Sequence, residues 1–161
     1  MFEAVRLTRA GSLAEAIELL IDQATISVDA ALYRFNHPRL AQALEAAQKR
    51  GVNIRMVLDR NKYQETAATR ALMSQSRVPF RLLYGRRGPG TKMHHKFVII
   101  DSTKVLTGSY NWTLESEEQN YENLLELATP EIIRFYQDEF ERLWKDATPG
   151  PIGNSKPENG Y

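Results

Sequence analysis

The stretch "KMHHKFVIIDSTKVLTGSYNW", residues 92–112, decides the fold of this chain. Its run at 97–100 is apolar at every position, which is typical of a central strand that is covered on both faces of a sheet. A three-residue turn at 102–104 separates this run from a second apolar segment at 105–110. The pattern therefore predicts a β-hairpin, with two histidines and a lysine where its first strand begins.

Outward from the hairpin, strand-like and helix-like segments alternate along the chain. Ser12 and Glu15 form a capping box, Asn36 is expected to cap a helix with Pro38 in its first turn, and Gly51 ends that helix. The expected strands are 2–8, 25–33, 52–59, 79–84, 94–101, 105–110 and 122–128, and the expected helices are 13–22, 39–50, 64–76 and 130–145.

This alternation predicts an α/β fold, a sandwich of helices around a mixed sheet. We find no internal repeat and no linker, so residues 1–146 are expected to form one catalytic domain. The segment 147–161 is polar and rich in proline and glycine, and we expect it to be a disordered tail.

Composition excludes several classes of protein. The 161 residues are 42% hydrophobic and 25% charged, as in ordinary soluble globular chains, and they include no cysteine. Disulfides, zinc fingers and thiol nucleophiles are therefore excluded. We see no apolar run long enough to cross a bilayer and no secretory signal, so a soluble protein is expected, either cytoplasmic or exported with its signal removed.

Charge is unevenly distributed, although the net charge is only +1. Between residues 66 and 100 there is no acidic side chain, whereas residues 111–146 are predominantly acidic. The cations Arg86, Arg87 and Lys92 lie in a glycine-rich loop just before the histidines. This pattern favours an anionic ligand, and the alternative is a solvated cationic loop.

His94 and Lys96 are two residues apart and so share one face of a strand, a pairing that suits a phosphate group. The ammonium group neutralises an oxyanion, while the imidazole attacks phosphorus or moves a proton. Ser109 and Asn111 add a hydroxyl and an amide, and Glu122 is placed to accept a hydrogen bond from one nitrogen of His94.

Other assignments of these side chains are simpler or weaker. His95 points away from His94, so the adjacent imidazoles cannot easily share a metal ion, and no metal or other cofactor is predicted. Asp101 is most simply the residue that starts a turn. His37 has no lysine partner and is expected to lie at a helix start.

The spacing of His94, Lys96, Asp101, Gly108, Ser109 and Asn111 resembles the HKD motif of the phospholipase D superfamily. The segments 12–35 and 40–61 resemble the units that precede this motif in small bacterial endonucleases and in the mitochondrial cardiolipin hydrolase, or Zucchini, branch. The resemblance covers residues 3–146 and implies a phospholipase D-like α/β/α sandwich. The catalytic set that it implies is His94, Lys96, Asp101, Ser109, Asn111 and Glu122.

The resemblance also implies a mechanism without a metal ion. One histidine attacks a phosphodiester to form a phosphohistidine, and a second, protonated histidine supplies the leaving oxygen with a proton. Because this chain carries the motif once, we expect a homodimer that combines two copies of His94.

A nuclease acting on single-stranded DNA or RNA is the favoured prediction for substrate. The expected substrate-binding residues are Lys96, Asn111, Arg86, Arg87, Lys92 and Trp112. Tyr84, Tyr110 and Trp112 would stack bases if they are exposed, but at least two of them are expected in the core. Hydrolysis of a membrane phospholipid such as cardiolipin is the first alternative, and an idle nucleic-acid-binding module is the second.

Overall fold

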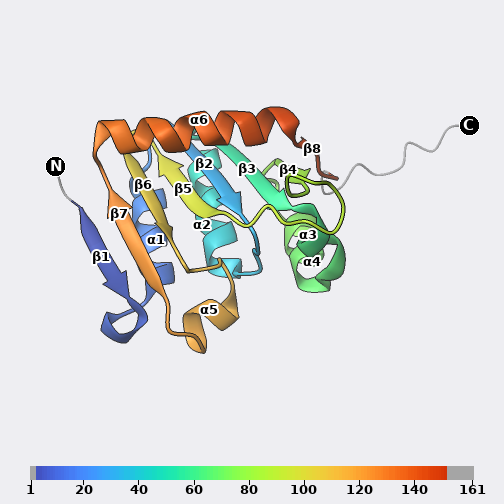
Figure 1. Cartoon of the computed structure of the whole chain (residues 1–161). Coiled ribbons are helices and arrows are strands. Elements are labelled where there is room, and N and C mark those ends of the chain that lie inside the picture. Colours follow the sequence, from blue (N-terminus) through green and yellow to red (C-terminus); the bar gives the residue numbers. More distant parts are fainter. Residues whose placement is uncertain (1–2, 152–161) are drawn as a thin grey trace, which may run out of the picture.

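The computed structural model describes residues 3–151, which form one mixed sheet of eight strands in the order β1-β7-β6-β5-β2-β3-β4-β8 (Figure 1). β2, β3 and β4 are parallel, and the other pairings are antiparallel. The strands are β1 Ala4–Leu7, β2 Ser27–Leu32, β3 Asn53–Asp59, β4 Phe80–Leu83, β5 Lys96–Ile100, β6 Lys104–Gly108, β7 Asn123–Leu127 and β8 Thr148–Pro149.

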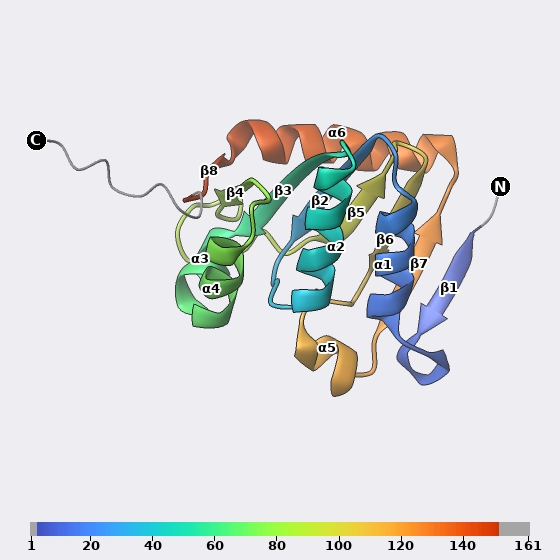
Figure 2. The same cartoon turned by 180° about the vertical axis from the view of Figure 1, so that it is seen from behind.

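Helices cover both faces of this sheet, which confirms the predicted α/β sandwich. The two long helices α1 and α2 lie on one face and α6 crosses the other (Figures 1 and 2). The helices are α1 Leu13–Gln23, α2 Pro38–Lys49, α3 Arg60–Glu65, α4 Ala67–Gln75, α5 Leu114–Glu118 and α6 Pro130–Asp146, with a short 3₁₀ helix at Thr8–Ala10. Within residues 3–151, no helix has both the length and the apolar character needed to cross a membrane.

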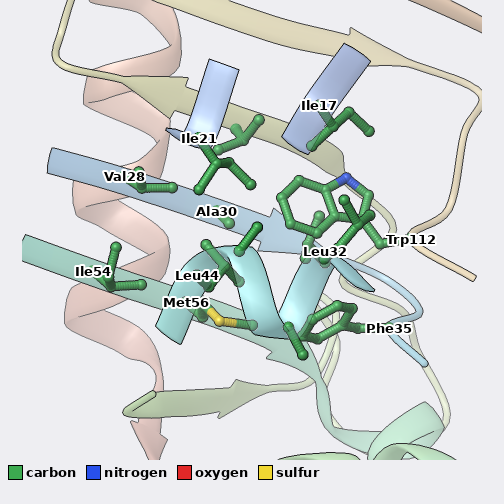
Figure 3. Close-up of a cluster of buried hydrophobic side chains, with 14 of the residues drawn as sticks. Ile17, Ile21, Val28, Ala30, Leu32, Phe35, Leu44, Ile54, Met56 and Trp112 are labelled. Carbon is green, nitrogen blue, oxygen red and sulfur yellow. The ribbon is translucent and has the colours of Figure 1, made fainter. Parts of the chain in front are cut away.

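The two faces of β5 belong to two separate clusters of buried side chains. Val98 and Ile100 face α1 and α2, while Phe97 and Ile99 pack against α6. All four are at most 4% exposed, which confirms the prediction of a central strand. Figure 3 shows the first cluster, in which side chains of α1, α2, β2 and β3 pack together with Phe35 and Trp112.

Several expected boundaries differ from those in the structure. The single helix expected at 64–76 is two helices, α3 and α4, separated at Thr66, because Asp59 caps an earlier start by accepting from the Lys62 N–H. β5 begins at Lys96 rather than at His94. β8 lies inside the segment expected to be a tail, where Thr148 pairs with Leu82 of β4. The rest of the expected tail, from residue 152, lies outside the described residues.

The helix caps are partly as predicted. Ser12 accepts from the backbone N–H of Glu15, as the capping box requires. Asn36 does not cap α2, since His37 occupies the N-cap position and the Asn36 side chain instead accepts from the Leu114 N–H at 3.1 Å. The reason is tertiary: the N–H groups of Asn36 and His37 both donate to the Trp112 carbonyl, which holds Asn36 beside the start of α5.

Candidate functional site

Most of the polar side chains that were singled out from the sequence lie together along the edge of the sheet that is formed by the strand ends. β2, β3 and β6 end at this edge, and β5 and β7 begin there, because β5 is antiparallel to β2 and β6. In the register, Leu32 lies opposite Lys96 and Gly108 lies opposite Leu124. The residues that flank these positions, from four separate parts of the chain, therefore meet at one end of the molecule.

His94 and Lys96 lie together on this edge, as the alternation predicts. The Lys96 ammonium nitrogen is 3.2 Å from His94 Nδ1 and donates to the His94 carbonyl oxygen at 3.0 Å. The imidazole also packs against the ring of Tyr33, with 4.3 Å between the ring centroids. His94 is thus exposed to a ligand on one side and held by a cation and an aromatic ring on the other.

The surroundings favour a neutral imidazole. Loss of water against Tyr33, followed by the positive charges of Lys96 and Lys92, lowers the pKa of His94 below its usual range. Burial also lowers the pKa of Lys96, and the negative charge of Glu122 opposes that change. A neutral nitrogen lone pair beside an ammonium group can attack a phosphorus atom whose charged oxygens the cation binds.

Ser109 and Glu122 form the second part of the site. The Ser109 hydroxyl donates to Glu122 and accepts from the Asn123 N–H at 3.1 Å. Gly108 permits this approach of β6 to β7, since a Cβ there would overlap the Asn123 carbonyl. The expected hydrogen bond from His94 to Glu122 is not formed within the protomer, where Glu122 accepts from Ser109 and Asn120.

Asn111 lies half-buried just beyond Ser109. Its side-chain oxygen is buried and has no hydrogen-bond partner among the described residues. A buried amide that lacks partners is costly unless a ligand or water satisfies it. The structure therefore leaves one acceptor of Asn111 without a partner among the described residues.

Asp101, which was expected in the catalytic set, makes structural contacts away from the other residues of that set. It lies at the opposite end of β5 from Lys96. Its carboxylate accepts from the backbone N–H groups of Thr25, Ile26 and Ser27 at 3.0, 2.8 and 2.9 Å. These bonds outweigh the effect of burial and lower the pKa of Asp101. Through these hydrogen bonds, the Asp101 carboxylate connects the β5–β6 turn to the start of β2.

Trp112 cannot bind substrate as expected, because it is only 2% exposed and packs edge-on against Phe35 in the core (Figure 3). Tyr110 is also buried, and its hydroxyl donates to Glu117 at 2.8 Å. Tyr84 is half-buried. The expectation that at least two of these three aromatic residues belong to the core is confirmed.

The basic loop before His94 borders an open cavity of about 570 Å³. Leu83 and Met93 contribute apolar lining, Arg86, Lys92 and His94 contribute basic groups, and α6 contributes the carboxylates of Glu139 and Asp146. Arg86, Arg87 and Lys92 are all exposed, and the cavity does not include Arg87. The cavity therefore combines cations of the loop, carboxylates of α6 and apolar lining.

The adjacent histidines diverge, as predicted. His95 Nε2 lies 3.0 Å from a carboxylate oxygen of Glu139 on α6, on the face of the sheet away from His94. His37 lies at the start of α2, also as expected. Among residues 3–151, no group of three or more histidines and carboxylates is arranged to hold a metal ion.

Two residues of the site were not singled out from the sequence. Tyr33 follows β2 and supports the His94 ring, and its N–H donates to the His95 carbonyl at 2.8 Å. Asp59 ends β3, is 1% exposed and accepts from the Met93 N–H at 2.8 Å. A polar residue that ends a buried apolar strand is the one sequence signal that would have indicated Asp59.

Comparisons with known proteins agree with this geometry. A family model described as the PLD-like domain of cardiolipin synthase matches residues 17–144. Mitochondrial cardiolipin hydrolase of Xenopus tropicalis is 37% identical over 131 residues, covering 81% of this chain and 60% of that protein. The human cardiolipin hydrolase is 34% identical over 126 residues, covering 78% of this chain and 48% of that protein. The chain thus spans about half to three-fifths of these relatives.

Two solved structures cover nearly the whole fold. The phospholipase D family member Nuc from Salmonella typhimurium matches with a TM-score of 0.82 and 27% identity, covering 92% of this chain and 99% of that one. NucT from Helicobacter pylori has the same TM-score and the same coverage at 23% identity, a likeness of fold.

Proposed function

Because the chain belongs to the phospholipase D superfamily of phosphodiesterases, we propose that it is a metal-independent nuclease that cleaves DNA or RNA, preferentially single-stranded. The observation that carries the proposal is the contact between His94 and Lys96 at 3.2 Å, beside an exposed basic loop. An imidazole that stays neutral next to a cation is suited to attack on a phosphodiester.

In the proposed reaction, the His94 nitrogen attacks phosphorus, and the bond from phosphorus to the leaving oxygen breaks. The Lys96 ammonium group and the side-chain N–H of Asn111 donate to the non-bridging oxygens. A second, protonated imidazole gives its proton to the leaving oxygen, then takes one from the water that hydrolyses the phosphohistidine. Since the chain supplies one such histidine, the second comes from another copy of the chain in a homodimer.

The surroundings of the site support a polyanionic substrate. Arg86, Arg87 and Lys92 are exposed in the loop before His94, within the acid-free segment 66–100. Several cations that each contact a phosphate give binding that depends strongly on salt and weakly on sequence.

A phospholipid is the second candidate substrate, and one observation favours it. Three vertebrate relatives named mitochondrial cardiolipin hydrolase share 30% or more identity with most of this chain. The reacting group in that lipid is also a phosphodiester, so the same His94 and Lys96 would serve. An idle binding module is disfavoured, because binding alone needs neither a neutral His94 nor Glu122.

The test is cleavage of labelled single-stranded DNA, RNA and cardiolipin vesicles in excess EDTA. Wild type should cleave nucleic acid, and His94→Ala should lower turnover by about a thousandfold or more. His95→Ala is the matched control, since its ring is bound to Glu139 on the opposite face. Release of phosphatidic acid without nucleic-acid cleavage would move the assignment to lipid, and loss of activity in EDTA would contradict metal independence.

A further inference from the structure

We propose that Lys62 and Lys92 form a second anion subsite around the ring of Tyr33, beside His94, and that it takes the phosphate next to the scissile one. The proposal rests on the proposed function and deepens it. It implies that the substrate contains several linked phosphodiesters, of which one binds at His94 and the adjacent one binds at the subsite.

Three ammonium groups converge on Tyr33 from three elements. Lys62 of α3 and Lys92 of the loop each lie 5.9 Å from the centroid of its ring, and Lys96 of β5 lies 5.5 Å from it. The same ring packs against His94 at 4.3 Å. Lys96 contacts His94 and is assigned to the reacting phosphate. Lys62 and Lys92 therefore remain to bind a second anion.

Buried polar contacts fix the segments that carry these two lysines. Asp59 accepts from the N–H of Lys62 and from the N–H of Met93, both at 2.8 Å. Asn61 donates from its side chain to the Thr91 carbonyl at 2.9 Å. The start of α3 is therefore hydrogen-bonded to the loop before His94, so the fold sets the distance between the two backbone segments that carry the lysines.

The acidic groups nearby leave the subsite cationic. Glu65 pairs with Lys62 at 2.8 Å, but its side chain is 59% exposed, and exposed ion pairs contribute little free energy. Asp59 is occupied by two backbone N–H groups. Arg34 follows Tyr33 and lies 3.7 Å from Glu115. A phosphate that makes charge-assisted bonds to Lys62 can therefore replace the weak contact with Glu65.

The experiment compares a substrate that has a neighbouring phosphate with one that lacks it. Lys62→Gln is assayed on a single-stranded oligonucleotide and on bis(p-nitrophenyl) phosphate, which carries one phosphodiester. The ratio of the two kcat/KM values, oligonucleotide over ester, should fall about tenfold. Lys49→Gln is the matched control, because Lys49 is an exposed helical lysine at the end of α2, away from the catalytic edge.

Binding supplies an independent measurement. The slope of log affinity against log salt for a single strand should become shallower by about 0.7 in Lys62→Gln. An unchanged ratio with an unchanged slope would overturn the subsite. If wild type cleaves no nucleic acid, the proposed function fails, and the slope alone then decides the subsite: a shallower slope supports it and an unchanged slope overturns it.

Discussion

His94 works as a nucleophile only if its ring is both neutral and fixed. Tyr33 supports one face of the ring, and Lys96 contacts its Nδ1 at 3.2 Å. The same lysine that would bind the phosphate also lowers the pKa of the imidazole, after the effect of burial. In the proposed reaction, Lys96 therefore has two roles: it helps to keep the His94 imidazole neutral, and it binds the charged phosphate oxygens.

This electrostatic arrangement predicts a shift in the pH profile. The pKa of His94 lies below 6.5, so its neutral form persists to more acidic pH than in a free imidazole. Lys92→Gln removes a positive charge and should raise that pKa, which moves the acidic limb of kcat/KM to higher pH. The profile is measured with bis(p-nitrophenyl) phosphate, with Lys49→Gln as control. A limb that stays in place or moves to lower pH would contradict the assignment.

Glu122 is predicted to act on turnover more than on binding. Its carboxylate accepts from Ser109, and its charge opposes the lowering of the Lys96 pKa by burial, which helps to keep the ammonium group protonated. Glu122→Gln removes the charge and keeps the shape, so kcat should fall by about tenfold or more while KM changes little. Separate determination of kcat and KM is the check, and equal losses in both would refute the role.

At the scale of elements, the β5–β6 hairpin has the candidate site at one end and the turn that contains Asp101 at the other. Its far turn places Asp101 and Ser102 at φ of 51° and 55°, in the left-handed region. Aspartate tolerates that region better than most residues. The Asp101 carboxylate then ties the turn to the start of β2.

Asp101→Ala should therefore lower stability rather than alter the chemistry. Losing the acceptor of three backbone N–H groups should reduce the free energy of unfolding by about 2 kcal/mol. Asp101→Asn keeps the turn and one acceptor oxygen, so its loss should be smaller. Urea unfolding measures both, and a large fall in kcat of folded Asp101→Ala would argue against a purely structural role.

The stability that the Asp101 carboxylate contributes should depend on pH. The pKa of Asp101 is lowered in the folded chain, so the carboxylate contributes stability above its unfolded value of 3.8. That contribution is lost as pH falls through the folded value. The difference between wild type and Asp101→Ala should therefore shrink under acidic conditions below about pH 4.

At the scale of the whole molecule, each chain brings one His94–Lys96 pair to the edge of its sheet. The proposed reaction needs two imidazoles in opposite protonation states. Two protomers related by a two-fold axis would supply them, with His94 as nucleophile in one and as general acid in the other.

Mixing subunits tests this assembly directly. In an equal mixture of wild type and His94→Ala that exchanges freely, about a quarter of random dimers keep both imidazoles. Activity per wild-type subunit should then fall to about half. Sedimentation at assay concentrations checks the assembly itself. Activity that stays proportional to the wild-type subunits, or an active monomer, would refute the shared site.

Local patterns were sufficient for much of this protein. The alternation of strands and helices, the run at 97–100 and the spacing of His94 and Lys96 predicted the α/β sandwich and the pair at its edge. These features depend on short-range periodicity, because successive side chains on a strand point to opposite faces and residues two apart share a face.

Only the tertiary structure decided which polar and aromatic residues lie together at the candidate site and which lie in the core or at the far end of the sheet. Asp101 lies at the far end of β5, Trp112 lies in the core, and Thr148 pairs with β4 through contacts distant in sequence. Tyr33 meets His94, Lys62 and Lys92 for the same reason. Spacing along a chain fixes the face of a strand, whereas the register between strands fixes which ends come together, and register depends on the packing of the whole sheet.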